Sequence, residues 1–329
     1  MIRNIASHLP ATVLSNDELA RIYPGWSAER IWEKTGIRER RIVKEGECAS
    51  DLAFGAAERL MASGTRDIDY LLFCTQSPDY LLPTTACLLQ HRLGLPTTCA
   101  ALDFNLGCSG YIYGLSLANS LLQSGAATKV LLLTADTYSR LIHPLDKSTR
   151  TIFGDAGTAT LLVKESKARL HSFLLGSDGS GGEQLMVKTR GARFPSQEGQ
   201  SPTVDDSGNV HDPGCLYMNG PEIFNFTLKA VPKLVQGVLD RAKLNLEDID
   251  LIIFHQANAY MLEHLRRKLG IPSDRFVIHL ELSGNTVSST IPLALEQVLK
   301  SGRLQPGMKV LLAGFGVGYS WGGCILEWN

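Results

Sequence analysis

Hydrophobic and polar positions follow two different periods along this chain, and the two periods alternate. Apolar residues recur at helical spacing in residues 50–64 and in residues 224–244. Short apolar runs of strand length lie between such stretches, for example in residues 129–136 and 309–316. Strands that alternate with helices are typical of βαβ units and of mixed or mostly parallel sheets. The pattern therefore predicts an α/β protein.

Two pairs of segments repeat each other in the same order. In the first pair, residues 68–80 and 249–261 both open with Ile-Asp and continue into an apolar strand. In the second pair, residues 120–136 and 297–316 both pass through Ser-Gly into a Lys-Val-Leu-Leu strand. The separation between the two members is nearly the same in both pairs, which indicates an internal duplication.

The duplication predicts two similar halves, an N-terminal half at residues 1–165 and a C-terminal half at residues 210–329. The length of 329 residues fits roughly two domain-sized units. Residues 166–209 are rich in Gly, Ser, Asp and Pro and show little periodicity, so we expect a connecting excursion there. A connection of this length usually carries function.

Charge and cysteine content narrow the class of protein. Lys and Arg number 32 against 33 Asp and Glu, so no overall field favours nucleic acid or a membrane surface. The chain has no apolar run of transmembrane length, and its N-terminus lacks a signal-peptide core. The seven cysteines are odd in number and lack CxxC spacing, which argues against a disulfide framework or a metal site. We expect a cytoplasmic protein with reduced thiols.

Cys108 is the first candidate for chemistry. It lies in Leu-Gly-Cys-Ser-Gly, between a strand-like segment and an apolar helix. The unpaired N–H groups at a helix start favour a thiolate. One helix-end interaction of ~1 kcal/mol lowers a thiol pKa by less than one unit, so this activation is incomplete without a partner. A buried structural cysteine is the alternative interpretation.

A histidine and an asparagine lie at two other predicted element ends. His255 follows the strand-like residues 250–254, and ligands bind at the carboxyl ends of strands in α/β sheets. This position suits proton transfer or oxyanion stabilisation, with a structural histidine as the alternative. Asn285 lies in a Ser-Gly-Asn-Thr loop before a helix, where capping alone would also explain it.

The glycine-rich residues 314–323 follow a strand as a dinucleotide-binding loop would. Their glycines do not fit GxGxxG, and too few residues follow Gly323 to form a crossover helix. A nucleotide-binding unit is therefore excluded. We expect these glycines to let backbone N–H groups approach a reacting carbonyl, with a tight turn as the alternative.

Together these segments resemble the 3-oxoacyl-ACP synthase III family, the ketoacyl synthases that begin fatty-acid chains. In chain order, the matching segments are TGIRERRI (35–42), GCSG (107–110), FGDAGTATLL (153–162), MNGPEIF (218–224), HQAN (255–258), SGNTVSSTIPLAL (283–295) and GFGVGYSWGG (314–323). The resemblance covers essentially the whole chain. It implies the thiolase fold, a duplicated αβαβα five-layer sandwich, and a homodimer.

The resemblance also implies roles for the candidate residues. Cys108 would be the acylated nucleophile, while His255 and Asn285 would polarise the malonyl thioester carbonyl as carbon dioxide leaves. Two neutral donors at this oxygen would stabilise charge only as the enolate develops. Backbone N–H groups of Cys108 and of Val317, where the family usually has glycine, would form an oxyanion hole. No bound cofactor is expected, and the substrates would be thioesters of CoA or of ACP phosphopantetheine.

Further positions acquire expected roles in the same way. Three residues would line the substrate tunnel: Phe224, Ala257 and Asn258. Leu82 would occupy the position that limits the length of the acyl group. A basic cluster of Arg266, Arg267 and Lys268 would dock the acidic acyl carrier protein. The alternative interpretation of this cluster is a solvated charged face.

The family's CoA platform is altered in this chain. Where the family stacks the adenine between a tryptophan and an arginine, this chain has Arg30 and Lys34. Two further family arginines are matched by Lys147 and Tyr260. Because lysine cannot reproduce the planar stacking of arginine, the identity of the acyl donor and its carrier stays open.

The sequence thus predicts an acyl-Cys108 thioester that condenses, with decarboxylation, with a malonyl thioester, malonyl-ACP being the expected one. One alternative is a specialised acyl transfer or condensation for a secondary metabolite or a surface glycolipid. Another is a non-catalytic partner subunit, against which the intact Cys108, His255 and Asn285 count. A cysteine hydrolase would need an ordered base near its thiol, and the chain-wide resemblance leaves no room for that fold.

Overall fold

The computed structural model describes residues 1–62, 64–164, 168–195, 201–206 and 208–329. Its strands are β1 Ile2–His8, β2 Thr12–Ser15, β3 Glu39–Ile42, β4 Tyr70–Cys74, β5 Ala100–Phe104, β6 Lys129–Asp136, β7 Ala156–Val163, β8 Arg169–Ser177, β9 Leu185–Met186, β10 Thr203–Val204, β11 Val210–His211, β12 Tyr217–Met218, β13 Leu251–Phe254, β14 Phe276–Val277, β15 Met308–Gly316 and β16 Ser320–Trp328. Its α-helices are α1 Asn16–Ile22, α2 Ala28–Thr35, α3 Ala49–Leu60, α4 Thr85–Arg92, α5 Gly110–Ser124, α6 Lys147–Arg150, α7 Gly220–Ala242, α8 Ala259–Lys268 and α9 Thr290–Lys300.

Two five-stranded mixed sheets repeat the same series of pairings. Their strand orders are β5-β4-β6-β7-β1 and β14-β13-β15-β16-β8. In each sheet the first two pairings are parallel and the last two are antiparallel. This correspondence supports the predicted duplication of the chain.

The structure assigns part of the predicted connection to the second half of the protein. β8 lies within the segment 166–209 that the sequence assigns to a connection, yet it is the edge strand of the second sheet. The predicted boundary at residues 165 and 166 falls outside the described residues. The division at 165 and 210 therefore stays a prediction.

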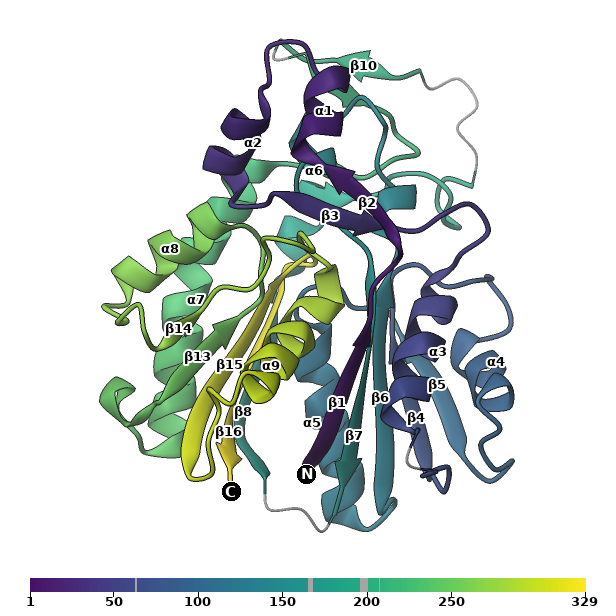
Figure 1. Cartoon of the computed structure of the whole chain (residues 1–329), viewed down its shortest axis with the longest axis vertical. Helices are drawn as coiled ribbons and strands as arrows, with labels where there is room; N and C mark the ends of the chain where they lie inside the picture. Colours follow the sequence, from purple (N-terminus) through teal and green to yellow (C-terminus); the bar gives the residue numbers. More distant parts are fainter. Residues whose placement is uncertain (63, 165–167, 196–200, 207) are drawn as a thin grey trace.

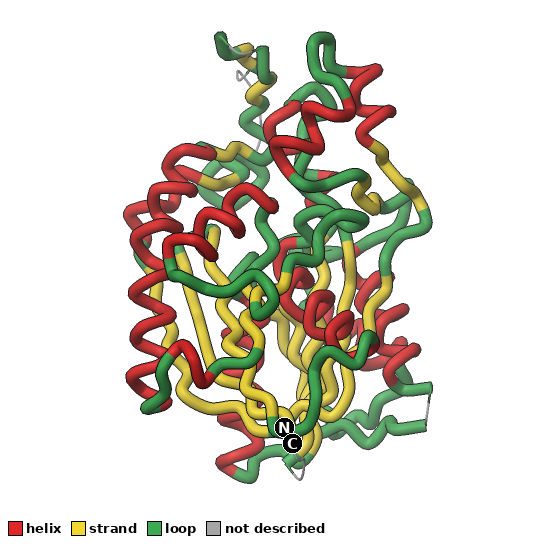
Figure 2. The backbone as a smooth tube through the Cα atoms, turned by 60° about the vertical axis from the view of Figure 1, so that its left-hand side comes forward, coloured by secondary structure: helices red, strands yellow, loops and turns green. Residues whose placement is uncertain are grey.

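Helices and sheets stack in five layers (Figures 1 and 2). α5 and α9 lie between the sheets, while α3 with α4 and α7 with α8 cover their two outer faces. β6 illustrates how one strand serves two layers. Val130 and Leu132 pack in the central core, and Leu131 and Leu133 pack under α3, because successive strand residues point to opposite faces. Strands that are apolar on both faces explain the continuous hydrophobic runs in the sequence.

The two predicted amphipathic helices exist with shifted ends. The helix expected at residues 50–64 is α3, and the helix expected at 224–244 is α7. α7 begins earlier than predicted because Asn219 caps it: the Asn219 side chain accepts a hydrogen bond from the N–H of Glu222.

A cap of residues 12–42 lies over one end of both sheets (Figure 1). β2, β3, α1 and α2 form this cap around a small cluster of Leu14, Leu19, Tyr23 and Ile31. The carboxyl ends of the parallel strands β5 and β13 point toward this end of the molecule. Across the described ranges, no helix combines the length and the apolar character that spanning a bilayer requires.

Candidate active site

Cys108, His255 and Asn285 line one cavity of about 350 Å³. Each comes from a different part of the fold. Cys108 lies between β5 and α5, His255 follows β13, and Asn285 lies in the loop before α9. All three side chains are buried, with exposed fractions of 6%, 2% and 4%. The structure therefore brings together the three residues that the sequence singled out.

The Cys108 thiol is protonated at rest. Burial, and to a smaller extent the Asp136 carboxylate, raise its pKa to about 12, against the backbone N–H groups of Val317 and of Cys108 itself, which lower it. The N–H groups therefore act in the direction that the sequence predicts, but burial outweighs them in the resting enzyme. The physical reason is desolvation, which disfavours the charged form of a buried thiol.

Strand β15 passes directly against the nucleophile. A methyl group added to Gly316 would lie 2.8 Å from the Cys108 sulfur, and one added to Gly314 would lie 2.7 Å from the Cys108 carbonyl oxygen. β15 and β16 form an antiparallel hairpin, which confirms that no crossover helix follows the glycines. Val317 lies in the turn of this hairpin, and its backbone N–H lowers the pKa of the Cys108 thiol. The role of Val317 as an oxyanion donor stays a prediction.

His255 is held as a neutral imidazole. Its Nδ1 lies 2.7 Å from Oγ1 of Thr290 on α9. Burial lowers its pKa to about 3, against a smaller opposing effect of the Val287 carbonyl. Because Thr290 engages Nδ1, Nε2 is the ring nitrogen that is left for a ligand.

Asn285 is fixed from two sides. Its N–H donates to the carbonyl of Ile152 at 2.9 Å, and its carbonyl accepts from the N–H of Gly154 at 3.0 Å. Its side-chain Oδ1 accepts from the N–H of Val287 at 2.9 Å. The capping role that the sequence left as an alternative thus uses only the side-chain oxygen Oδ1, and Nδ2 is left as a donor for a ligand.

The predicted tunnel residues divide into two groups. Phe224, Ala257 and Asn258 line the same cavity as Cys108. Asn258 also caps α8, because its Oδ1 accepts from the N–H of Met261 at 2.8 Å. Leu82 lies in the loop between β4 and α4, is 86% exposed and is absent from this cavity wall. Within one copy of the chain, the structure does not bring Leu82 to the site.

The predicted docking cluster at the end of α8 is partly neutralised. Arg266 and Arg267 both donate to the carboxylate of Glu263, at 2.6 Å and 2.8 Å. Nζ of Lys268 donates to the carbonyl of Leu228 at 2.9 Å. The cluster therefore offers an acidic partner less positive charge than the sequence suggests.

Trp26 is a feature of the altered CoA platform that sequence reasoning missed. The cations of Arg30, Lys34 and Lys147 lie 5.5 Å, 5.2 Å and 6.0 Å from the centre of its ring. Cation–π attraction holds such groups over an indole. These are three of the positions at which the chain departs from its family's CoA platform. The signal in the sequence was an aromatic residue four positions before Arg30.

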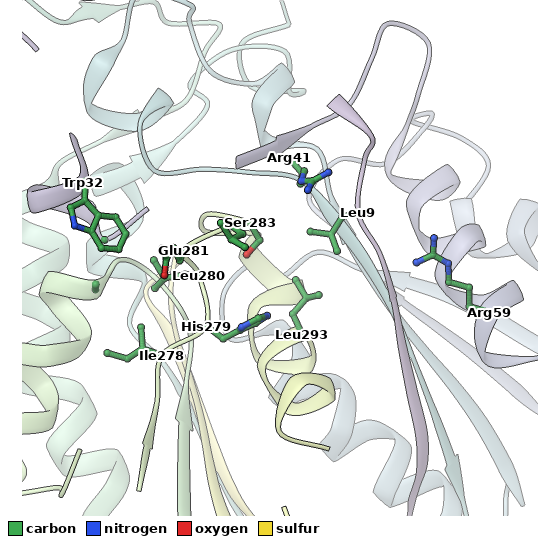
Figure 3. A pocket seen from close by; sticks show the side chains of 13 residues that line it. Leu9, Trp32, Arg41, Arg59, Ile278, His279, Leu280, Glu281, Ser283 and Leu293 are labelled. Atoms are coloured by element: carbon green, nitrogen blue, oxygen red, sulfur yellow. The ribbon is translucent and has the colours of Figure 1, made fainter. Parts of the chain in front are cut away.

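A larger cavity of about 640 Å³ lies elsewhere, between the cap, α3 and α9 (Figure 3). The residues that shape it include Leu9, Arg41, Arg59, His279, Ser283 and Leu293. None of the three candidate catalytic residues lies in its wall, so chemistry rather than volume identifies the active site. Among the residues that the structure describes, no group of His, Cys, Asp or Glu could hold a metal ion.

Two stacked mixed sheets, with a cysteine, a histidine and an asparagine meeting at one end of them, define an acyltransferase of the thiolase fold. Comparisons with known proteins give its family. Residues 102–179 match the model of 3-oxoacyl-[acyl-carrier-protein] synthase III, and residues 239–328 match the model of its C-terminal part. The chain belongs to the 3-oxoacyl-[acyl-carrier-protein] synthase III family.

Individual relatives agree along the full length. The beta-ketoacyl-[acyl-carrier-protein] synthase III of Xylella fastidiosa is 38% identical, over 99% of this chain and 98% of the relative. A crystal structure of a 3-oxoacyl-(acyl-carrier-protein) synthase III is 52% identical, with a TM-score of 0.97 and 99% of both chains covered. The 3-oxoacyl-(acyl-carrier protein) synthase of Burkholderia xenovorans is 40% identical, with a TM-score of 0.89, over 100% of this chain and 93% of that one.

Proposed function

We propose that this enzyme takes up an acyl group on Cys108 and condenses it with a malonyl thioester, expected to be malonyl-ACP, to give a 3-oxoacyl thioester and carbon dioxide. The observation that carries the proposal is the shared cavity of Cys108, His255 and Asn285. The Val317 N–H at the Cys108 sulfur supports it. The substrates are thioesters of CoA or of ACP phosphopantetheine, and each step uses groups of the chain itself.

The first step transfers the acyl group to the enzyme. The Cys108 sulfur attacks the donor carbonyl, the Cys108 S–H bond and the donor C–S bond break, and a new C–S bond forms. The proton passes overall to the departing thiolate. Since burial keeps the Cys108 thiol protonated, the N–H groups of Cys108 and Val317 are the main aid to this step. They stabilise the negative oxygen of the tetrahedral intermediate.

The second step makes the carbon nucleophile. The malonyl C–C bond to its carboxylate breaks, carbon dioxide leaves, and the electron pair moves into the thioester enolate. Nε2–H of His255 and Nδ2–H of Asn285 donate to the enolate oxygen. In the resting structure the Thr290 hydroxyl donates to the carbonyl of Val287 at 3.1 Å. For Nε2 of His255 to carry the proton, this hydroxyl must turn to donate to Nδ1, which lies 2.7 Å away. Neutral donors in a dry site act most strongly on charge as it develops.

The third step joins the two carbons. The enolate carbon attacks the acyl-Cys108 carbonyl, and the Cys108 C–S bond breaks as the intermediate collapses. The cysteine thiolate then takes up a proton, which restores the resting thiol. The oxyanion hole of Cys108 and Val317 serves this step as it served the first.

Leu82 acts, in this proposal, from a second copy of the chain. Leu81 and Leu82 are exposed apolar side chains, and β5 ends the first sheet. An exposed strand edge with apolar residues beside it favours pairing with another chain. In a homodimer joined there, Leu82 of the partner subunit would reach the acyl site. Light scattering tests the dimer, and Leu82→Trp should shorten the accepted acyl chain without changing the oligomeric state.

The acyl donor need not be the family's usual one. Three cations around Trp26, in place of an aromatic sandwich, change how a nucleotide would be held. This favours, as a second candidate, condensation of a specialised acyl donor for a secondary metabolite or a surface glycolipid. Either carrier could reach the site, and acyl carrier protein is the proposed partner of Arg266, Arg267 and Lys268.

We also propose that the enzyme works in the cytoplasm. All seven cysteines are free thiols in the structure. Unpaired cysteines are typical of proteins in a reducing compartment. Labelling of all seven thiols in protein taken directly from cells, without a reductant, would test this location.

The decisive experiment is intact mass spectrometry after incubation with a panel of acyl-CoA and acyl-ACP thioesters. We expect a mass increase of one acyl group that is absent in Cys108→Ala, and the preferred donor identifies the carrier. Added malonyl-ACP should then discharge the adduct and yield the 3-oxoacyl product. A folded enzyme with a free thiol and no adduct from any donor would favour a non-catalytic partner subunit instead.

A further inference from the structure

Arg40 is a fully buried arginine, with 0% of its side chain exposed. Among the residues that the structure describes, no carboxylate lies within ion-pair distance of its guanidinium, and its Nε has no hydrogen-bond partner. A buried charge without a counter-charge costs several kcal/mol. Such a costly group is expected to have a specific role.

The strand geometry of β3 explains how Arg40 reaches the interior. Successive residues of a strand point to opposite faces. Its neighbour Arg41 lines the large cavity in Figure 3. Arg40 therefore points the other way, into the layer that holds the loop of Asn285.

The guanidinium of Arg40 connects the cap to the segment before Phe153. Its Nη2 donates to the carbonyl of Thr151 at 2.6 Å, and its Nη1 donates to Oδ1 of Asn16 at 2.7 Å. Asn16 is itself fixed, because its Nδ2 donates to the carbonyl of Ile37 at 2.7 Å. Thr151 is thus held at a set distance from the cap.

The segment after Thr151 in turn holds Asn285. Two backbone hydrogen bonds join Asn285 to Ile152 and Gly154, and Phe153 pairs with Asn285 as in a sheet. The stem of Arg40 fills the space behind this pairing. A methyl group on either Gly154 or Gly284 would lie 3.1 Å from the Arg40 Cβ.

We propose that Arg40 is a positioning residue that holds the Asn285 side chain in the geometry required for decarboxylation of the malonyl thioester. This inference rests on the proposed function. Cys108 is positioned by other elements, α5 and β15. Loss of Arg40 should therefore impair decarboxylation and condensation while leaving acylation of Cys108 nearly intact, a separation that a general packing role would not produce.

The two half-reactions test this role separately. In Arg40→Lys, which keeps a charge but not the fork of donors, we expect acylation of Cys108 within about threefold of the unsubstituted enzyme, whereas condensation should fall by roughly 10²-fold, as small misplacements of reacting groups do. Leu60→Ala, in the outer core under α3, is a control for lost stability and should change both half-reactions equally. Asn16→Ala, which removes one hydrogen-bond partner of Arg40, replaces Arg40→Lys if that variant does not fold. It should also lower the rate of condensation more than the rate of acylation.

A double-mutant cycle completes the test. If Arg40 acts through Asn285, then Arg40→Lys in an Asn285→Ala background should lower condensation no further than Asn285→Ala alone. The positioning role would be overturned if the losses of condensation rate in the two single variants added up in the double variant. It would also be overturned if Arg40→Lys slowed acylation and condensation equally, or if it condensed at the full rate. Absence of any adduct on Cys108 in the unsubstituted enzyme would overturn the proposed function itself, and with it this inference.

Discussion

Nδ1 of His255 lies 2.7 Å from Oγ1 of Thr290, and that hydroxyl donates to the carbonyl oxygen of Val287 at 3.1 Å. Thr290 therefore joins the imidazole to the turn that follows Asn285. Asn285 lies in the same short stretch of chain as Thr290, and His255 contacts that stretch through the Thr290 hydroxyl. This hydroxyl should therefore help to fix the distance between the side chains of His255 and Asn285.

Thr290→Val should slow decarboxylation of the malonyl thioester. The substitution keeps the shape of the side chain but removes the hydrogen bond, which is worth roughly 1 kcal/mol, so a loss of about fivefold is expected. Thr290→Ser should retain most of the rate. Release of carbon dioxide from malonyl-ACP by the acyl-enzyme measures this step. Equal rates in the Val and Ser variants would contradict a role of the hydroxyl.

Asn285→Asp should slow condensation more strongly than Thr290→Val does, while leaving acylation of Cys108 nearly unchanged. The new side chain still accepts from the N–H of Val287, but it replaces the Nδ2 donor with a second oxygen. Loss of one donor to a developing oxyanion costs about 10²–10³-fold, and a negative carboxylate adds repulsion. Acylation of Cys108, followed by intact mass, should change little. A condensation rate within tenfold of the unsubstituted enzyme would remove Asn285 from the mechanism.

Gly316→Ala should block the nucleophile. The added methyl group would lie 2.8 Å from the Cys108 sulfur and 2.7 Å from its Cβ, closer than unbonded atoms approach. We expect acylation to fall by at least about 10²-fold, because the sulfur must move from its attack position. Gly179→Ala is the matched control, since its methyl group would meet no atom within 4 Å. Normal acylation in Gly316→Ala would show that β15 does not constrain Cys108.

The alternation of strands and helices could be predicted because its cause is local. β6 and β15 are apolar on both faces, and each lies between a central helix layer and an outer one. Cys108 and His255 could be selected because each lies just beyond a strand, where open α/β sheets bind ligands. Asn285 had a weaker local signal, and only its resemblance to a family motif distinguished it from a helix cap.

Other properties of the site depend on parts of the chain that are distant in sequence. Burial of the Cys108 thiol depends on Gly316 lying against it, and the effect of this burial on the thiol pKa outweighs that of the N–H groups, which the sequence predicts. The grouping of Lys147 with Trp26 depends on how α6 packs beside the cap. Leu82 is exposed in a single chain, so its proposed role depends on a second copy that one sequence does not describe.

Asp136 should make the stability of the enzyme depend on pH. Burial raises its pKa to about 7, against hydrogen bonds from Ser288 and the N–H of Gln76, which lower it, while Asp155 raises it further. The folded chain then holds a proton on Asp136 between about pH 4 and 7, where the unfolded chain has lost it. This contribution to the free energy of unfolding is present below about pH 4 and is lost as the pH rises to 7.

Asp136→Asn removes this titration and provides the test. The free energy of unfolding of the unsubstituted enzyme, relative to that of Asp136→Asn, should decrease as the pH rises from 4.5 to 8, by about 1.4 kcal/mol for each unit between the two pKa values. Urea unfolding at several pH values measures the difference, and a constant m-value shows that both proteins unfold in the same way. Comparing the two proteins cancels the titration of groups that do not interact with Asp136, including His255, whose lowered pKa acts in the opposite direction as the pH falls below 6.5. If the two pH profiles ran parallel, Asp136 would be ionised in the folded state, and its hydrogen bonds to Ser288 and Gln76 would outweigh its burial.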